Sequence, residues 1–498
     1  MYTPAFCHSP RSRFARFRSL FLGLVGGALG TLCLCTPACG GKEGSPADGP
    51  DGTAGSSAGA GAISPGGSAP DAGTPSVGGM ANGGTASGSA GVANTTGGVS
   101  GGGAGGTTAS AGTTFTTAGA PPGPLEGTAT RPQFGATTAA DFTVLKYFEK
   151  GSTVDAPIAD NWDPTAGVGD VTALTPTYTV ATSGGTDTTI QSAIDKAVAA
   201  GGTTRVAIEV TDGTYREVAC VPSGAPPITL YSKNPDATAT RIVFNNYNGK
   251  PKDANTPANP CNPAIGSATY GTSGSPTFAA YANGFQAKNL TFENDTDETG
   301  IAANVQAVAL ATQGDKQIYE NVRLLGNQDT FYVKSGAVNI LARVYVTKSF
   351  IQGDTDFIFG RGVLVLDSTE IHFVSSRQGS KGYAIVPSTD ARNPFGILVT
   401  KSQFTADAAT TAGSIYLGRA WDESGMNLAA YTMLAGTGVY PNGQALIRES
   451  TLGAHIRAND PWAPAATTAR PYSSVPTTAP ANRMYEFNNT GPGAAPVK

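Results

Sequence analysis

One short pattern recurs through the second half of the chain and limits how the chain can fold. Each copy has a few β-forming residues, one small polar residue, further β-formers and then a turn. The spacing between copies is irregular, and each copy is too short to bury its own apolar face. Copies of this kind are expected to stack as coils around a shared core. The copies are Phe285–Phe292, Ile318–Leu325, Tyr345–Ile351, Val365–Phe373, Ile397–Phe404 and Leu446–Leu452, with Asn289, Asn321, Ser349, Ser368, Ser402 and Ser450 as the polar residues.

The pattern predicts an all-β fold, a single-stranded right-handed parallel β-helix with long loops. Asn-Gly hairpin turns between period-2 strands are rare, which weighs against a β-sandwich. A β-propeller is the alternative, although no blade motif is present. One helix is predicted, over Ser192–Ala200, because the apolar spacing is helical and Gly201-Gly202 follows. This short N-terminal helix is expected to cap the coils, and everything after it is predicted as short strands, beginning with Arg205–Val210 and Thr214–Val218.

The first quarter of the chain has a different composition. Residues 40–125 consist mainly of Gly, Ala, Ser, Thr and Pro, with few side chains that could form a core. Such a segment is predicted to be a disordered tether, because it buries too little apolar surface to offset the loss of backbone entropy. The folded domain is therefore expected at residues 126–498.

Residues 1–39 have the features of an export signal. Four arginines between residues 11 and 18 precede an apolar stretch from Leu20 to Leu34. Small residues then lead to Cys39, and a glycine-rich segment follows, as in a bacterial lipoprotein signal. Cys39 is the expected lipidation site, and Cys35 is the alternative. A plain signal peptide or an uncleaved anchor helix would also fit this pattern.

Two further cysteines and the charge balance bear on the environment of the chain. Cys220 and Cys261 are the cysteines of the folded part, and an oxidising compartment would favour a disulfide between them. Two unpaired thiols are the alternative. The formal net charge is −4, and no basic stripe lies outside the extreme N-terminus. We therefore expect no nucleic-acid partner.

Nucleophilic triads, metal sites and phosphate loops find little support in the sequence. His372 and His455 are the histidines outside the N-terminal signal, and each has the surroundings of a packed or surface residue. The Gly-x-Ser-x-Gly strings at 55–59 and 98–102 lie in the tether, where no strand-to-helix elbow can form. No spaced metal ligands or phosphate loop occur in the folded part. We therefore expect neither a metal nor another cofactor.

Two aspartates form the most promising candidate site. Asp329 and Asp356 are 27 residues apart, close to one coil of the repeat. Equivalent positions on neighbouring coils lie about 4.8 Å apart, which is the spacing of paired strands. Two carboxyl groups that close cannot both ionise easily, so one is expected to stay protonated and the other to be a carboxylate. The pair could supply an acid and a nucleophile at the same pH.

Polar and aromatic residues of nearby strings could complete this site. Gln306 and Gln328 can donate amide hydrogen bonds to a developing oxyanion. Arg419 can hold one carboxylate through a bidentate contact, and Trp421 offers a flat apolar face to a sugar ring. Turn-capping aspartates or a structural ion pair would be the purely architectural interpretation.

At these residues the chain resembles the pectin methylesterase (pectinesterase) family. The resemblance covers roughly residues 130–490, and residues 482–489 are similar to a bacterial branch of outer-membrane lipoproteins. Position 420 is Ala where many members have Pro. The matching strings, in the family's order, are GTYRE (213–217), QAVAL (306–310), GNQDTFYV (326–333), GDTDFIFG (353–360) and LGRAW (417–421).

The resemblance implies a role for each candidate residue. Asp356 would attack the C6 methyl ester of galacturonate, and Asp329 would act as acid and then as base. Gln306 and Gln328 would bind the oxyanion, and Arg419 would orient Asp356. Phe359 and Trp421 would contact the sugar chain. The implied mechanism needs no metal.

The expected partner is methylated homogalacturonan (pectin) or its oligomers, and the expected protein is a monomer. Membrane association is expected only through the N-terminal lipid, in an exported protein of the outer membrane or cell surface, or else a secreted one. Two alternatives remain for the activity itself: an esterase or thioesterase acting on oligogalacturonides or small esters, and a non-catalytic carbohydrate-binding surface lipoprotein. A pectate lyase would share the fold but would need calcium-binding carboxylates and a base.

Overall fold

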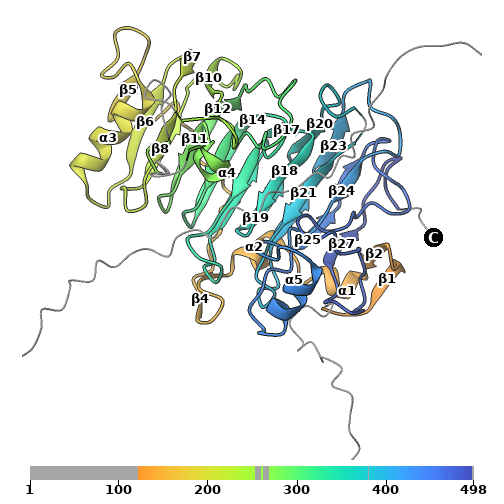
Figure 1. Cartoon of the computed structure of the whole chain (residues 1–498). Helices are drawn as coiled ribbons and strands as arrows, with labels where there is room; N and C mark the ends of the chain where they lie inside the picture. The colour runs from red at the N-terminus through yellow and green to blue at the C-terminus, as the bar shows by residue number, and fades with distance from the viewer. Residues whose placement is uncertain (1–121, 253–258, 262–267, 380, 496–498) are drawn as a thin grey trace, which may run out of the picture. The chain divides into compact units, whose positions relative to one another are not determined.

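The computed structural model describes residues 122–252, 259–261, 268–379 and 381–495 (Figure 1). The predicted export signal with Cys39, and the tether up to residue 121, lie outside the described residues. None of the helices within the described ranges combines the length and apolar character needed to span a bilayer.

Seven strands form one parallel ladder, with one strand contributed by each successive coil. Their pairing is parallel throughout, so each strand is reached from its neighbour by a full turn of the chain. The strands are β8 (Ala219–Val221), β11 (Phe278–Ala280), β13 (Leu310–Thr312), β15 (Phe331–Val333), β18 (Thr355–Gly360), β21 (Tyr383–Pro387) and β24 (Tyr416–Gly418).

Two further parallel ladders close the coil and merge at its long strands. β12 (Gln286–Asn294) pairs with β9 near its start and with β10 near its end, and β14 (Gln317–Leu325) pairs likewise with β16 and β17. The first ladder also contains β5 (Tyr178–Val180), β6 (Val206–Val210), β9 (Ile228–Tyr231), β16 (Arg343–Thr347), β19 (Val363–Asp367), β22 (Ile397–Thr400), β25 (Gln444–Arg448) and β27 (Arg483–Phe487), and the second contains β7 (Gly213–Arg216), β10 (Thr240–Phe244), β17 (Phe350–Gly353), β20 (Glu370–Phe373), β23 (Gln403–Ala406) and β26 (Thr451–Leu452). The predicted right-handed parallel β-helix is confirmed.

The recurring sequence pattern corresponds to a bend between strands. At each bend one residue has a left-handed backbone, which lets the chain turn sharply. The small polar residues named from the sequence occupy two adjacent register positions. Asn289, Asn321 and Ser368 have the left-handed backbone, whereas Ser349, Ser402 and Ser450 come one residue later, in the row that also contains Thr369. The sequence alone could not distinguish the two positions because small polar residues occur at both. The left-handed residues are Asn289, Asn321, Lys348, Ser368, Lys401, Glu449 and Asn488.

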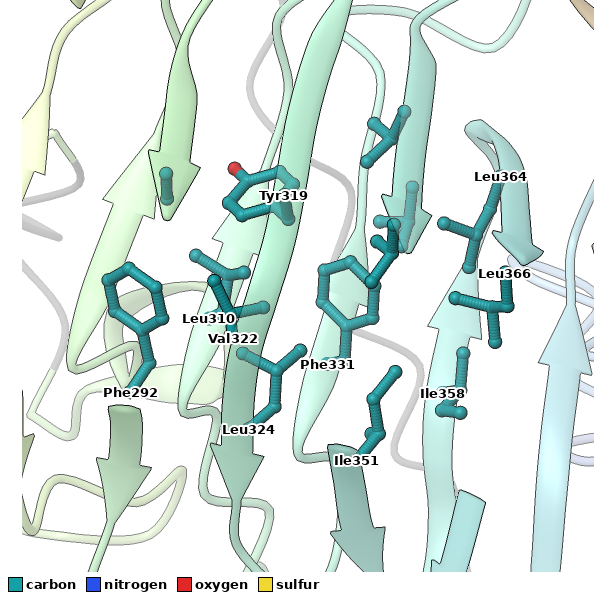
Figure 2. Close-up of a cluster of buried hydrophobic side chains, with 14 of the residues drawn as sticks. Phe292, Leu310, Tyr319, Val322, Leu324, Phe331, Ile351, Ile358, Leu364 and Leu366 are labelled. Carbon is teal, nitrogen blue, oxygen red and sulfur yellow. The ribbon is translucent and has the colours of Figure 1, made fainter. Parts of the chain in front are cut away.

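Apolar side chains from all three ladders fill the interior of the coils. In Figure 2, side chains from successive coils stack between the facing strands, for example Phe292, Leu324 and Ile351. Phe331 and Ile358 belong to the seven-stranded ladder, where the register pairs them directly, so their side chains stack on each other. No single coil could bury these residues, so the stack is the unit of stability.

Different elements cover the two ends of the stack (Figure 1). The predicted helix is present as α3 (Ile190–Ala200), which begins at the capping residue Thr189, ends at left-handed Gly201 and packs beside β5, β6 and β8. At the opposite end, β2 (Arg131–Phe134) pairs with β27 and with β1 (Leu125–Thr128). A small hairpin, β3 (Lys150–Ser152) and β4 (Pro157–Ala159), follows the short helices α1 (Ala136–Ala139) and α2 (Val144–Phe148).

The prediction of strands alone after residue 200 was wrong in two loops. A single helical turn, α4 (Gly271–Gly274), precedes β11, and α5 (Leu428–Ala435) lies between β24 and β25. Asn427 caps α5 by accepting a hydrogen bond from the Ala430 N–H. The apolar residues of α5 occur all around the helix and give no helical period in the sequence, although Tyr431 and Ala435 are the ones buried.

Candidate active site

Asp329 and Asp356 occupy equivalent places on neighbouring coils. Phe331 of β15 pairs with Ile358 of β18, and each aspartate lies two residues before its paired residue. The Asp329 N–H donates to the Thr355 carbonyl at 3.0 Å, so the two segments touch. Both aspartates have left-handed backbones, with φ of 65° and 51°. The two residues are only 3% and 2% exposed. The structure therefore brings together the two residues that the sequence singled out.

Arg419 reaches Asp356 from the coil segment that follows β24. Its Nε and a terminal nitrogen donate to the two carboxylate oxygens of Asp356, at 2.8 and 2.6 Å. The guanidinium also lies over the ring of Tyr383, 3.9 Å from the ring centre. A bidentate contact fixes the orientation of a carboxylate and stabilises its charged form. The geometry is therefore that of an oriented, ionised Asp356.

The surroundings of Asp329 favour the opposite protonation state. Burial raises the pKa of Asp329 well above its ordinary value, and the nearby charges of Asp356 and Glu298 raise it further. The Arg419 and Arg377 guanidiniums oppose this shift more weakly. One carboxyl oxygen, Oδ1, is buried and has no hydrogen-bond partner within the described ranges. A protonated carboxyl group suits such a place better than a carboxylate does.

Gln306 and Gln328 lie on segments that touch each other, and Gln328 directly precedes Asp329. The Ala307 N–H donates to the Gln328 carbonyl at 3.1 Å, which ties the two segments together. The side chain of Asn248 donates to Oε1 of Gln306 at 3.0 Å. Because Oε1 accepts this bond, the Nε2 end of the Gln306 amide remains as the donor end. Asn248 therefore sets which end of Gln306 can bind an oxyanion.

Three aromatic rings line the outer face of the sheet next to the aspartates. Tyr332 and Phe359 stack with ring centres 4.3 Å apart. Trp421 meets both rings edge-on, at 6.2 and 5.7 Å, and is 8% exposed. The structure thus brings Phe359 and Trp421 together, and adds Tyr332. The alternation Phe331-Tyr332-Val333 could have revealed Tyr332, since its neighbours point into the core.

Several polar residues around the site were missed in the sequence. Asp354 was visible within GDTDFIFG, two residues before Asp356, but the sequence analysis gave it no role. Asn248, Glu298 and Arg377 lie in loops outside the matching strings, and no spacing rule connects them to Asp329. Only the folded chain places Glu298 and Arg377 among the charges that act on Asp329.

The remaining sequence candidates lie elsewhere in the chain. Cys220 on β8 and Cys261 form a disulfide, with Cα atoms 5.7 Å apart. His372 lies on β20, where its Nδ1 is 2.8 Å from the Thr405 hydroxyl. The proposed lipidation site, Cys39, lies outside the described residues.

Comparison with known proteins assigns the family. The pectinesterase family model matches residues 177–445, more than half of the chain. This chain belongs to the pectinesterase family. Over 371 residues it is 46% identical to a pectinesterase of Ralstonia solanacearum, covering 74% of this chain and 92% of that protein. The family is one of carboxylic ester hydrolases, and the resemblance drawn from the sequence strings is confirmed.

Solved structures of pectinesterases have the same fold. The rice weevil pectin methyl esterase superposes with a TM-score of 0.63 at 32% identity, covering 74% of this chain and 98% of that one. A pectin methylesterase solved in complex with a hexasaccharide superposes with a TM-score of 0.51 at 25% identity. That alignment covers 66% of this chain and 92% of the other.

Proposed function

We propose that this pectinesterase hydrolyses the C6 methyl esters of galacturonate in pectin, releasing methanol and leaving free carboxylates. Membership of the family supports the substrate class. One structural observation carries the mechanism: Asp356, paired with Arg419, and Asp329, buried and in no ion pair with any described residue, lie on adjacent coils. Two carboxyl groups in such different environments can serve as nucleophile and acid together.

In the first half of the reaction, a carboxylate oxygen of Asp356 attacks the ester carbonyl carbon. The carbonyl π electrons move onto oxygen, and the amide N–H groups of Gln306 and Gln328 stabilise this oxyanion. When the carbonyl re-forms, the bond to the methoxy oxygen breaks and Asp329 donates its proton to that oxygen. Methanol leaves, and the galacturonate acyl group remains joined to Asp356 as an anhydride.

In the second half, Asp329 is a carboxylate and can act as a base. It removes a proton from water, and the resulting hydroxide attacks the acyl carbon of the anhydride. The bond to Asp356 breaks, which returns Asp356 to its carboxylate form under Arg419. Asp329 is protonated again, and the product is a galacturonate residue with a free carboxyl group.

The aromatic rings next to the dyad would contact the sugar chain. Trp421 keeps a small exposed area above the buried pair of Tyr332 and Phe359. An apolar ring face of this kind suits the C–H face of a sugar. We therefore propose that Trp421 makes the direct contact and that Phe359 supports it from below.

Methanol release from highly methylated pectin tests this function directly. The wild-type protein is expected to release methanol and an equal amount of acid, and to form no unsaturated product absorbing in the ultraviolet. Short methylated oligomers and a simple thioester, assayed in parallel, would reveal an esterase of other specificity. Binding of pectin without methanol release would instead indicate a carbohydrate-binding protein, and ultraviolet-absorbing product abolished by EDTA would indicate a lyase.

We also propose that the enzyme is exported and anchored by a lipid on Cys39. The arginine-rich start, the apolar stretch and the small residues before Cys39 support this, as does the Gly/Ser-rich segment that follows. Labelling of the expressed full-length protein with a radioactive fatty acid tests it. Cys39→Ala should abolish labelling, whereas loss of label in Cys35→Ala alone would move the anchor to Cys35.

A further inference from the structure

A second group of buried charges lies behind the two aspartates. Arg377, in the loop between β20 and β21, donates from Nε to Asp354 Oδ2 at 2.9 Å and from a terminal nitrogen to Oδ1 at 2.5 Å. The same terminal nitrogen donates to the Thr355 hydroxyl at 3.3 Å. Asp354 is fully buried and directly precedes the Thr355-Asp356 pair. Arg377 therefore holds the segment that carries the nucleophile.

The same guanidinium also faces the segment that carries the acid. Nε of Arg377 lies 2.8 Å from Oε2 of Glu298. Its N–H is directed to Asp354, so the contact with Glu298 is electrostatic and not a hydrogen bond. Oε1 of Glu298 accepts from the N–H of Gln328 at 3.4 Å, directly before Asp329. Glu298 and Arg377 thus connect the turn at Asp329 to the turn at Asp356.

The charges in this region do not balance if every group is ionised. Four buried carboxyl groups, Glu298, Asp329, Asp354 and Asp356, face two guanidiniums, Arg377 and Arg419. Tyr383, the other titratable group beside Arg419, is neutral because burial raises its pKa. Uncompensated buried charge is costly, so two of the four carboxyl groups are expected to carry protons. Asp354 and Asp356 have the bidentate contacts with the guanidiniums. The two protonated carboxyl groups are therefore expected to be Asp329 and Glu298.

We propose that Glu298, Arg377 and Asp354 form a positioning cluster that holds the two aspartate-bearing turns together and sets the charge beside Asp329. The inference rests on the proposed function, since Asp329 and Asp356 are its reacting groups. None of the three residues needs to touch the substrate. Burial raises the pKa of Glu298 to about 8, so this group exchanges its proton near neutral pH.

Opposite pH shifts in two variants would distinguish this role from a purely structural one. Arg377→Gln removes a positive charge that favours ionised Asp329, so the alkaline limb of kcat/KM for methanol release should move to higher pH. Glu298 becomes negatively charged as the pH rises through about 8 and then disfavours ionised Asp329, so in Glu298→Gln the limb should move to lower pH. Arg377→Gln should also lower kcat by about 10- to 100-fold through misplacement of the dyad, with little change in KM. Arg377→Lys should recover part of the wild-type profile.

A buried arginine far from the dyad provides the matched control. Arg131 binds both oxygens of Glu486 at 2.7 and 2.8 Å, at the far end of the stack. Arg131→Gln removes a comparable ion pair, so it should lower thermal stability but leave the pH profile at its wild-type position. If Arg377→Gln fails to fold, Glu298→Gln and Arg377→Lys carry the test. Limbs that stay unmoved, or that move in the same direction in the Arg377 and Glu298 variants, would overturn the proposal.

Infrared difference spectroscopy tests the charge assignment without turnover. A protonated carboxyl group absorbs at a higher C=O stretching frequency than a carboxylate does. At pH 6, set below the pKa of about 8, Glu298→Gln should remove one protonated-carboxyl band that the wild type shows. Retention of every such band would refute the assignment. A wild-type protein that shows the band but releases no methanol would instead refute the proposed function alone.

Discussion

The guanidinium of Arg419 binds both carboxylate oxygens of Asp356 across the intervening strand β21, at 2.8 and 2.6 Å. The contact spans 63 residues of sequence and two steps of the strand ladder. Asp329, on the other side of Asp356, forms no ion pair with a cation in the described part of the chain. We expect this asymmetry to give the two aspartates different protonation states, and the following predictions depend on it.

Removal of the proposed nucleophile should abolish turnover. Asp356→Asn keeps the size of the side chain but cannot form the anhydride, so kcat/KM for methanol release is expected to fall more than about 10⁴-fold. Circular dichroism should show that the β-helix remains folded. A folded variant with wild-type methanol release would refute the role of Asp356.

Arg419→Lys tests whether the two-point contact matters beyond its charge. An ammonium group keeps the positive charge but cannot bind both oxygens of Asp356 in one plane. We expect kcat to fall by about 10-fold or more, because the attacking oxygen is no longer held in place. Steady-state kinetics on methylated pectin measures this change. Near-normal kcat in the variant would show that charge alone is sufficient.

The acid role of Asp329 predicts the alkaline side of the pH profile. Only protonated Asp329 can donate to the leaving methoxy group, and its pKa lies well above the ordinary aspartate value of 3.8. Activity should therefore persist above pH 3.8 and decline as the pH rises through the elevated pKa of Asp329. Asp329→Asn is expected to lose about 10²- to 10⁴-fold in kcat. A variant with the full wild-type rate and the same alkaline limb would assign the acid to another group.

Asn248 should control the oxyanion donor of Gln306. In Asn248→Asp a carboxylate replaces the amide donor, and the Gln306 amide is expected to turn its N–H toward that carboxylate. Loss of one oxyanion donor costs about 10²- to 10³-fold in kcat. Asn248→Gln retains a donor and should lose less activity. Equal kcat for the wild type and Asn248→Asp, measured by methanol release, would contradict this role.

Glu298 should also make stability depend on pH. Its pKa is raised from 4.5 to about 8 in the folded protein, so the folded state holds the proton more tightly than the unfolded state does. The free energy of unfolding should therefore decrease as pH rises from about 4.5 to about 8. Urea unfolding of Glu298→Gln should show a smaller decrease over that range. A slope identical to that of the wild type would mean that Glu298 titrates normally.

The architecture followed from local features of the chain. The recurring pattern of β-forming residues and turns predicted the coils, because each copy leaves an apolar face that only a neighbouring copy can cover. The helix before Gly201 was predictable from its own spacing and stop signal, and it lies where expected. The polar residues of the pattern show the limit of this approach: they lie at two adjacent positions of the bend, and only strand register separates Asn289, Asn321 and Ser368 from Ser349, Ser402 and Ser450.

The sequence by itself determined the family, the coil-forming repeats and the residues of the strings around Asp329 and Asp356. The tertiary structure decided which distant side chains surround them: Asn248 on Gln306, and Glu298 and Arg377 behind the dyad. The physical reason is that repeat pattern and strand preference act between near neighbours in the chain. Burial, hydrogen bonding between loops and the summed field of charges depend on distances in space, and only the folded chain sets those distances.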